Sequence, residues 1–355
     1  MSVPNASGYF RTSYARDMAL LDTRAQRVAA GVFLVLALAL PIVDAPFLLD
    51  LANQVLLAVI GSVALMLVNG VAGQISLGHA GLLAAGAFTT GILVREAHAP
   101  FWVTLPAAAL VGALIGLIFG LPSLRLRGLY LAVSTLALHF VVIYLGNEYE
   151  SRRGYSTGVV IDPPSLWGVA LTAPRAWYYV LFVSALAALL LGVNLLRAKT
   201  GRAWRAIQGR EAVAEALGIN VPGYKVLAFT VSSTLTAVAG ALFSYYRGFV
   251  SAEAFSLFLT IQYVAMVIIG GMGSMLGAVL GAVFVTLFPY LIEWLMAILP
   301  TPAAWATSVF AVNYAAFGLM MILFLLYEPQ GLVGIWRRIQ NYFLLWPFQQ
   351  RPRGG

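Results

Sequence analysis

Long apolar runs recur along the whole chain, and they constrain its fold more than any other feature. An uninterrupted apolar run of about 20 residues has the length of a membrane-spanning helix, whereas a membrane β-barrel would show short alternating segments. Only 10% of the residues are charged and 61% are hydrophobic, far from the composition of a soluble domain. We therefore predict an all-α, polytopic membrane helix bundle of about ten transmembrane helices. The expected spans are 28–43, 51–70, 75–94, 102–121, 128–146, 177–196, 226–246, 257–272, 277–297 and 305–327.

The distribution of basic residues gives the orientation of these spans. With both termini in the cytoplasm, 16 of the 21 Lys and Arg residues fall on the cytoplasmic side. This bias agrees with the positive-inside rule, so the net charge of +8 reflects topology and predicts no nucleic-acid partner. Residues 1–355 are then one transmembrane domain, with cytoplasmic segments at 1–27, 197–225 and 328–355.

The chain lacks the motifs of an enzyme or an autonomous pump. It contains no phosphate-binding G-x-x-x-x-G-K-[ST] motif, no H-E-x-x-H motif and no pair of mid-span carboxylates. The ionisable residues within spans are few, mainly His79, His139 and Glu293. Ion-coupled carriers place such groups at mid-membrane, so we expect no catalytic residues, no cofactor, no metal and an energy source supplied by a partner.

Residues 73–88, "GQISLGHAGLLAAGAF", place four glycines and several polar side chains inside an expected span. One interpretation is tight helix packing, which small residues permit. The other is a discontinuous helix whose freed backbone groups face a translocation path. On the second interpretation Gln74, Ser76, Gly78 and His79 lie beside the path.

Residues 270–284, "GGMGSMLGAVLGAVF", faintly echo that segment. Paired glycine-interrupted segments indicate an internal repeat around a central path, although ordinary tight turns would leave the same pattern. We assign Gly271, Gly273 and Ser274 to this path. Thr135 joins them, because it shares a helix face with His139 and that face is expected to point into the bundle.

A short charged helix is predicted over 203–217, between two membrane spans. Gly218 suits its C-terminal cap, and Pro222 prevents simple continuation. Trp204, Ile207, Ala214 and Gly218 recur at three- and four-residue steps and form a small apolar face. We interpret this face as a docking surface for a partner, since a lipid anchor would carry bulkier side chains.

Four stretches together resemble a known family. They are "GQISLGHAGLLAAGAF", "LRGLYLAVSTLAL", "AEALGINVPGYK" and "LYEPQGLVGIW", which look like the LivM-type permease of branched-chain amino acid ABC importers. The resemblance covers about residues 55–338. "REAVAEALGINVPGYK" also resembles the coupling loop of ABC-importer permeases, although Val213 and the spacing from Glu211 to Gly218 depart from the strict pattern.

The resemblance implies a machine with several subunits. The partners would be a second, LivH-type permease, two cytoplasmic ABC ATPases and a periplasmic binding protein that delivers the amino acid, all at the bacterial inner membrane. The ATPases would dock on a segment that includes Arg210, Glu211, Ala212, Ala214 and Gly218. Glu211 would pair with a basic ATPase residue, an exposed interaction worth about 1 kcal/mol or less.

Two alternatives remain at this stage. Relatives that resemble this family carry urea or short amides, so the motifs describe the machine more than its cargo. A passive channel for a small polar solute is the alternative from another class. The helix predicted over 203–217 distinguishes the two classes, because a channel has little use for a docking helix.

Overall fold

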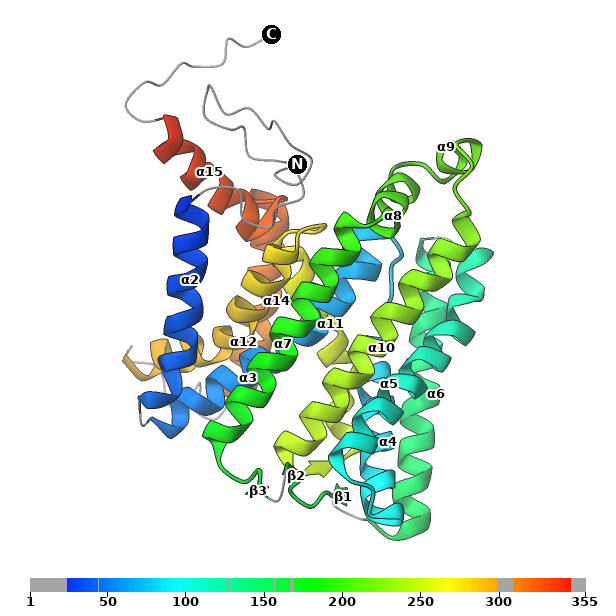
Figure 1. Cartoon of the computed structure of the whole chain (residues 1–355), viewed down its shortest axis with the longest axis vertical. Helices are drawn as coiled ribbons and strands as arrows, with labels where there is room; N and C mark the ends of the chain where they lie inside the picture. The colour runs from blue at the N-terminus through cyan, green and yellow to red at the C-terminus, as the bar shows by residue number, and fades with distance from the viewer. Residues whose placement is uncertain are drawn as a thin grey trace.

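The computed structural model describes residues 24–43, 45–126, 128–155, 158–166, 169–298 and 309–345. The described part of the chain is predominantly α-helical, and its long helices form one bundle (Figure 1). These long helices are α2 (Arg24–Ala39), α3 (Pro46–Leu65), α4 (His79–Ala97), α5 (Phe101–Gly120), α6 (Leu129–Arg153), α7 (Pro174–Arg197), α10 (Val221–Arg247), α11 (Leu257–Gly270), α12 (Met275–Ile298) and α14 (Val309–Tyr327).

Short elements connect the long helices. They are η1 (Leu40–Ile42), the π-helical turn η2 (Met66–Val71), η3 (Pro122–Leu124), η4 (Ala252–Phe255), α8 (Lys199–Gly209), α9 (Glu211–Ala216) and α15 (Gly331–Leu345). Four two-residue strands, β1 (Val159–Val160), β2 (Ser165–Leu166), β3 (Val169–Ala170) and β4 (Phe249–Val250), form two small antiparallel pairs, β1 with β4 and β2 with β3.

A helix lies at each of the ten expected spans, and six of the described helices are long and apolar enough to cross a membrane. A seventh crossing is added if the bent pair formed by α14 and α15 counts as one span. Helices α2 and α11 are apolar but shorter than a full span, and α4 does not meet the length and hydropathy criterion for a span. The polytopic helical bundle is therefore confirmed, and ten crossings with cytoplasmic termini stay a prediction.

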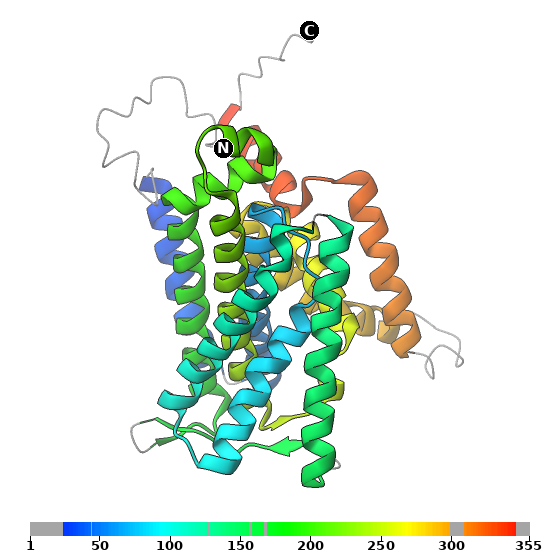
Figure 2. The same cartoon turned by 90° about the vertical axis from the view of Figure 1, so that its right-hand side faces the viewer.

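The two ends of the bundle differ. Helices α8, α9 and α15 lie at the same end of the bundle, and the short strands lie at the other end, in both views (Figures 1 and 2). Helix α10 starts beside α8 and α9 and ends next to β4, so it runs the length of the bundle.

Close helix contacts hold α10 at the centre of the bundle against α3, α4 and α5. A Cβ built at Gly112 of α5 would lie 2.5 Å from Cβ of Ala237, and one at Gly240 of α10 would lie 1.9 Å from the carbonyl oxygen of Leu83. No side chain fits at such distances. Glycine at these positions lets the backbones approach, which is how helices associate where lipid provides no hydrophobic drive between them.

Candidate functional site

The chain is not helical between η2 and α4. The expected span 75–94 is therefore corrected: α4 begins at His79, and residues 73–78 form an irregular segment. Side chains from other elements bind its freed backbone. The Ser76 N–H donates to Asn69 Oδ1 at 3.1 Å, and the Leu77 N–H donates to Thr135 Oγ1 at 2.9 Å. Irregular backbone inside a membrane requires such partners, so these hydrogen bonds are consistent with the expected break before α4.

The glycines of this region also pack helices closely. A Cβ at Gly78 would lie 2.5 Å from the carbonyl oxygen of Thr135, and one at Gly86 would lie 1.9 Å from that of Ala237. The close packing expected of these glycines is therefore confirmed, whereas the expectation that the freed backbone groups face a translocation path stays a prediction. The beginning of the segment forms the break, and its glycines bring α4 against α6 and α10.

The second glycine-rich segment packs against η2, the turn that precedes the first. Residues 271–274 link α11 to α12, with φ of +114° at Gly271 and +81° at Gly273. A Cβ at Gly70 would lie 2.9 Å from the backbone nitrogen of Gly273, and the Gly273 N–H donates to the Met66 sulfur at 3.2 Å. Residues 271–274 therefore lie against η2, just before the irregular segment, and a path shared by the two glycine-rich segments stays a prediction.

Most predicted path residues are enclosed in this conformation. Gln74, Ser76, His79 and Thr135 are each less than 5% exposed. The His79 ring lies 4.5 Å from that of Tyr263, and among the described residues neither its Nε2 nor the Gln74 amide has a hydrogen-bond partner. Ile75 is instead 48% exposed, so it is the side chain of the break that reaches the surface. Ile75 lies between the buried Gln74 and Ser76 in the irregular segment, a pattern that the helix expected over 75–94 did not indicate.

The charged segment between α7 and α10 consists of two helices, which corrects the single helix expected over 203–217. Arg210 separates α8 from α9 and has extended backbone angles, φ −156° and ψ 114°. The predicted cap is present, since Gly218 has φ +81° and the Ile219 N–H donates to the carbonyl of Ala214 at 3.1 Å. Glycine adopts this left-handed conformation without the penalty of a Cβ.

The face of this segment that was expected to dock is buried within the chain. Trp204 is fully buried and its Nε1–H donates to the carbonyl of Tyr224 at 2.8 Å, while Ala214 is 1% exposed. The exposed apolar side chains are Val213, at 52%, and Leu217, at 74%. A helical wheel alone did not distinguish these two faces, because the supporting helix α10 comes later in the sequence.

Glu211 also has a partner inside the chain. Its carboxylate lies 2.5 Å from the Lys225 ammonium on α10, and the two side chains are 25% and 5% exposed. Glu211 is thus already paired within the chain, and its expected contact with a basic ATPase residue stays a prediction. The ion pair joins α9 to the N-terminal part of α10, while Arg210 and Ala212 remain exposed beside it.

Gln208 connects this segment to the broken helix. Its Nε2–H donates to the carbonyl oxygen of Gly70 at 3.1 Å, and a Cβ at Gly73 would lie 2.9 Å from its Cγ. Gln208 therefore lies against the backbone at the end of η2 and at the start of the irregular segment. Nothing in the local sequence marks Gln208, because the contact joins residues 138 positions apart.

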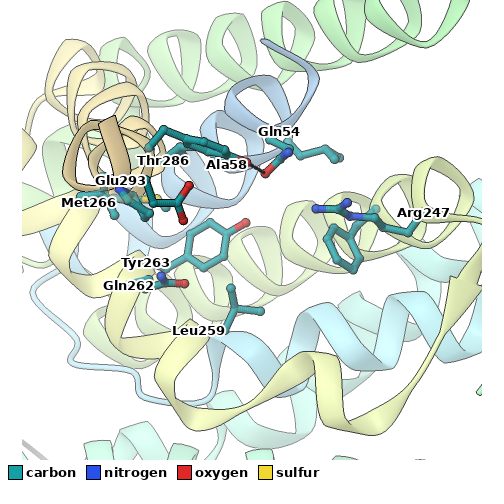
Figure 3. A pocket seen from close by; sticks show the side chains of 14 residues that line it. Gln54, Ala58, Arg247, Leu259, Gln262, Tyr263, Met266, Thr286 and Glu293 are labelled. Atoms are coloured by element: carbon teal, nitrogen blue, oxygen red, sulfur yellow. Dashed lines mark hydrogen bonds between the residues drawn. The ribbon is translucent and has the colours of Figure 1, made fainter. Parts of the chain in front are cut away.

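A cavity of about 390 Å³ opens between α3, α10, α11 and α12 (Figure 3). It lies toward the strand-bearing end of the bundle, since its wall includes Arg247 at the end of α10. Gln54 accepts a hydrogen bond from the Tyr290 hydroxyl at 3.3 Å across one wall. Of the polar residues here, the sequence indicated only Glu293.

These features define a class: a polytopic helical membrane protein with an irregular segment before α4 and a charged helical segment at one end of the bundle. Within that class, the chain belongs to the family described as "Branched-chain amino acid transport system / permease component", whose model matches residues 47–325. The resemblance seen in the four sequence stretches is thereby confirmed.

Curated relatives agree with this membership. The chain is 31% identical to the high-affinity branched-chain amino acid transport system permease protein LivM of Salmonella typhimurium, over 89% of this chain and 77% of that protein. LivM of Escherichia coli shows the same identity and coverage. The probable LivM permease of Methanocaldococcus jannaschii is 28% identical over 64% of this chain and 66% of its own length. No solved structure shows a significant match.

Proposed function

We propose that this chain is the LivM-type permease subunit of an ABC importer that passes branched-chain amino acids into the cytoplasm. Its partners are a second, LivH-type permease, two cytoplasmic ABC ATPases and a periplasmic binding protein. The complex resides in the bacterial inner membrane, with ten spans and both termini of this chain in the cytoplasm. Relatives named as branched-chain amino acid permeases support this cargo.

The observation that carries the proposal is the arrangement of α8 and α9 at one end of the bundle (Figure 1). Their inner face is anchored on α10, and Val213 and Leu217, one helical turn apart, project outward. Such a pair is a typical anchor for a helix that inserts into a groove of a partner. An ATPase bound there would move α8, and Gln208 would pass that movement to the break at Gly70.

The path is proposed to run along the two breaks. It would involve the residues assigned from the sequence. These residues are mostly buried here, and we expect them to face the path when the transporter changes conformation. These are Gln74, Ser76, Gly78, His79, Thr135, Gly271, Gly273 and Ser274. The chain supplies the path and the ATPases supply the energy, so no reaction is assigned to the chain itself.

The test is transport by the complete complex. The permease pair, ATPases and binding protein are reconstituted in proteoliposomes, and uptake of radiolabelled leucine and of urea is measured with and without internal ATP. We expect leucine uptake that requires ATP and the binding protein. Uptake of urea or an amide instead of leucine would show that the importer carries a different substrate. Uptake that proceeds without ATP would identify a passive channel.

ATPase docking is tested separately by cross-linking. A cysteine that replaces Leu217 is expected to cross-link to an ATPase in the assembled complex, because that side chain is 74% exposed at the proposed contact. A cysteine that replaces Ala214, which is 1% exposed, is the matched control and is expected to stay unlinked. The reverse pattern would contradict the assignment of the docking face.

A further inference from the structure

The cavity between α3, α10, α11 and α12 carries one basic and one acidic side chain in an otherwise uncharged wall. Arg247 and Glu293 approach it from opposite sides, with Tyr263 between them (Figure 3). Among the described residues neither charge has an ion-pair partner within 4.0 Å. The Arg247 guanidinium lies 5.8 Å from the centre of the Phe243 ring, which holds it at the rim.

The remaining wall is of two kinds. One part of the wall is apolar and consists of Leu57, Leu259, Met266 and Val285. Another part contains the side-chain amides of Gln54 and Gln262, which can form hydrogen bonds with a ligand. A volume of about 390 Å³ lies in the range of small-molecule sites, which are mostly apolar with a few polar groups that fix orientation. The wall therefore suits a small molecule that has two opposite charges and an apolar part.

An α-amino acid with a branched aliphatic side chain has this combination. Its carboxylate matches the fork of an Arg guanidinium, which binds carboxylates through two parallel hydrogen bonds. Its ammonium group would be bound by the Glu293 carboxylate, and its side chain would contact the apolar wall. A ligand with only one charge would make only one of the two charge-assisted interactions, so it is expected to bind less well.

The cavity also lies where an incoming substrate would arrive. Arg247 ends α10 at the end of the bundle opposite α8 and α9 (Figure 1). If α8 and α9 face the cytoplasm, the cavity is in the outer half of the membrane. A substrate released from a periplasmic binding protein would meet it before reaching the broken helices.

We propose that this cavity is a transient binding site for the zwitterionic amino acid, with Arg247 holding the carboxylate and Glu293 the ammonium group. The proposal rests on the function proposed above. Affinity is weak, in the millimolar range, because both charges lie at an open rim and a permease must release its cargo onward. The binding site would thus lie in the outer half of the path, with its two charged residues on α10 and α12.

The test measures weak binding directly. The assembled permease–ATPase complex in nanodiscs is examined by saturation-transfer NMR with millimolar leucine, leucinamide, 4-methylpentanoate and glycine. Leucine should give the strongest signal, because leucinamide lacks the carboxylate, 4-methylpentanoate lacks the ammonium group and glycine lacks the apolar side chain. Arg247→Gln and Glu293→Gln should each lower the leucine signal by about tenfold, the usual loss with one charged hydrogen-bond partner.

Controls separate binding from folding. Arg152→Gln and Glu253→Gln remove charges outside the cavity and should leave the signal unchanged, and Arg247→Lys should retain part of it. Wild-type leucine uptake combined with unaltered leucine signals in both cavity variants would overturn this inference alone. Absence of any amino acid uptake by the wild-type complex would instead overturn the proposed function. A third outcome would also overturn the inference. If the wild-type complex gives no leucine signal but retains phosphatidylethanolamine, and Arg247→Gln loses this lipid, the cavity is a lipid headgroup site.

Discussion

Replacing Glu211 with Gln is expected to loosen α9 from the bundle. The change removes the carboxylate that lies 2.5 Å from the Lys225 ammonium, whose side chain is 5% exposed. Breaking a buried ion pair from one side costs about 3–5 kcal/mol, because the other charge stays buried without its counterion. Glu211 is 25% exposed, so solvent screens part of the interaction, and we expect about 2 kcal/mol. This loss of about 2 kcal/mol exceeds the roughly 1 kcal/mol or less expected if Glu211 made only an exposed ion pair with an ATPase residue.

The loss is measured as local opening. Hydrogen exchange of the backbone amides of α9 is followed in the assembled complex in nanodiscs, together with ATP hydrolysis stimulated by the loaded binding protein. At 1.4 kcal/mol for each factor of ten, a loss of 2 kcal/mol speeds exchange by about 30-fold. Stimulated hydrolysis should fall in parallel, because α9 no longer holds Val213 and Leu217 in a fixed position.

Two variants decide the reasoning. Glu215→Gln removes an exposed carboxylate from the same helix and should change neither measurement. The double variant Glu211→Gln with Lys225→Met removes both charges, so it should recover most of the protection, since no buried ammonium is left without its counterion. Unchanged exchange in Glu211→Gln, or a double variant as open as the single one, would refute this account of the ion pair.

Three further predictions concern other contacts. Gly218→Val should uncouple substrate delivery from ATP hydrolysis while Gly218→Asn largely preserves it, because φ of +81° costs a side chain with a Cβ about 1–2 kcal/mol and Asn tolerates it best; equal coupling in both would contradict the cap. Ile75→Cys should react with a small water-soluble thiol reagent in the assembled complex and Ser76→Cys should resist it in the resting state, since their exposed fractions are 48% and 3%; equal rates would refute the placement of the break. Gln208→Leu should keep ATPase binding but lower leucine uptake per ATP hydrolysed, because the hydrogen bond to the carbonyl of Gly70 is lost, and wild-type stoichiometry would remove Gln208 from the coupling route.

The sequence by itself determined the elements that depend on local chemistry and on the solvent. Long apolar runs must become helices in lipid, because only internal hydrogen bonds satisfy the backbone there. Glycines within such a run predict a break or a close approach, and the region after Gly73 shows both. The left-handed cap at Gly218 followed in the same way from local preferences.

Only the tertiary structure decided which surfaces those elements present. Asn69 and Thr135 satisfy the broken backbone, and Lys225 turns Glu211 inward. Burial of Ala214 leaves Val213 as part of the exposed face. The cavity lined by Arg247 and Glu293 and the hydrogen bond from Gln208 to Gly70 are also formed only by tertiary packing. These contacts join residues far apart along the chain, and no local spacing or composition records them, because the packing of several helices brings the partners together at once.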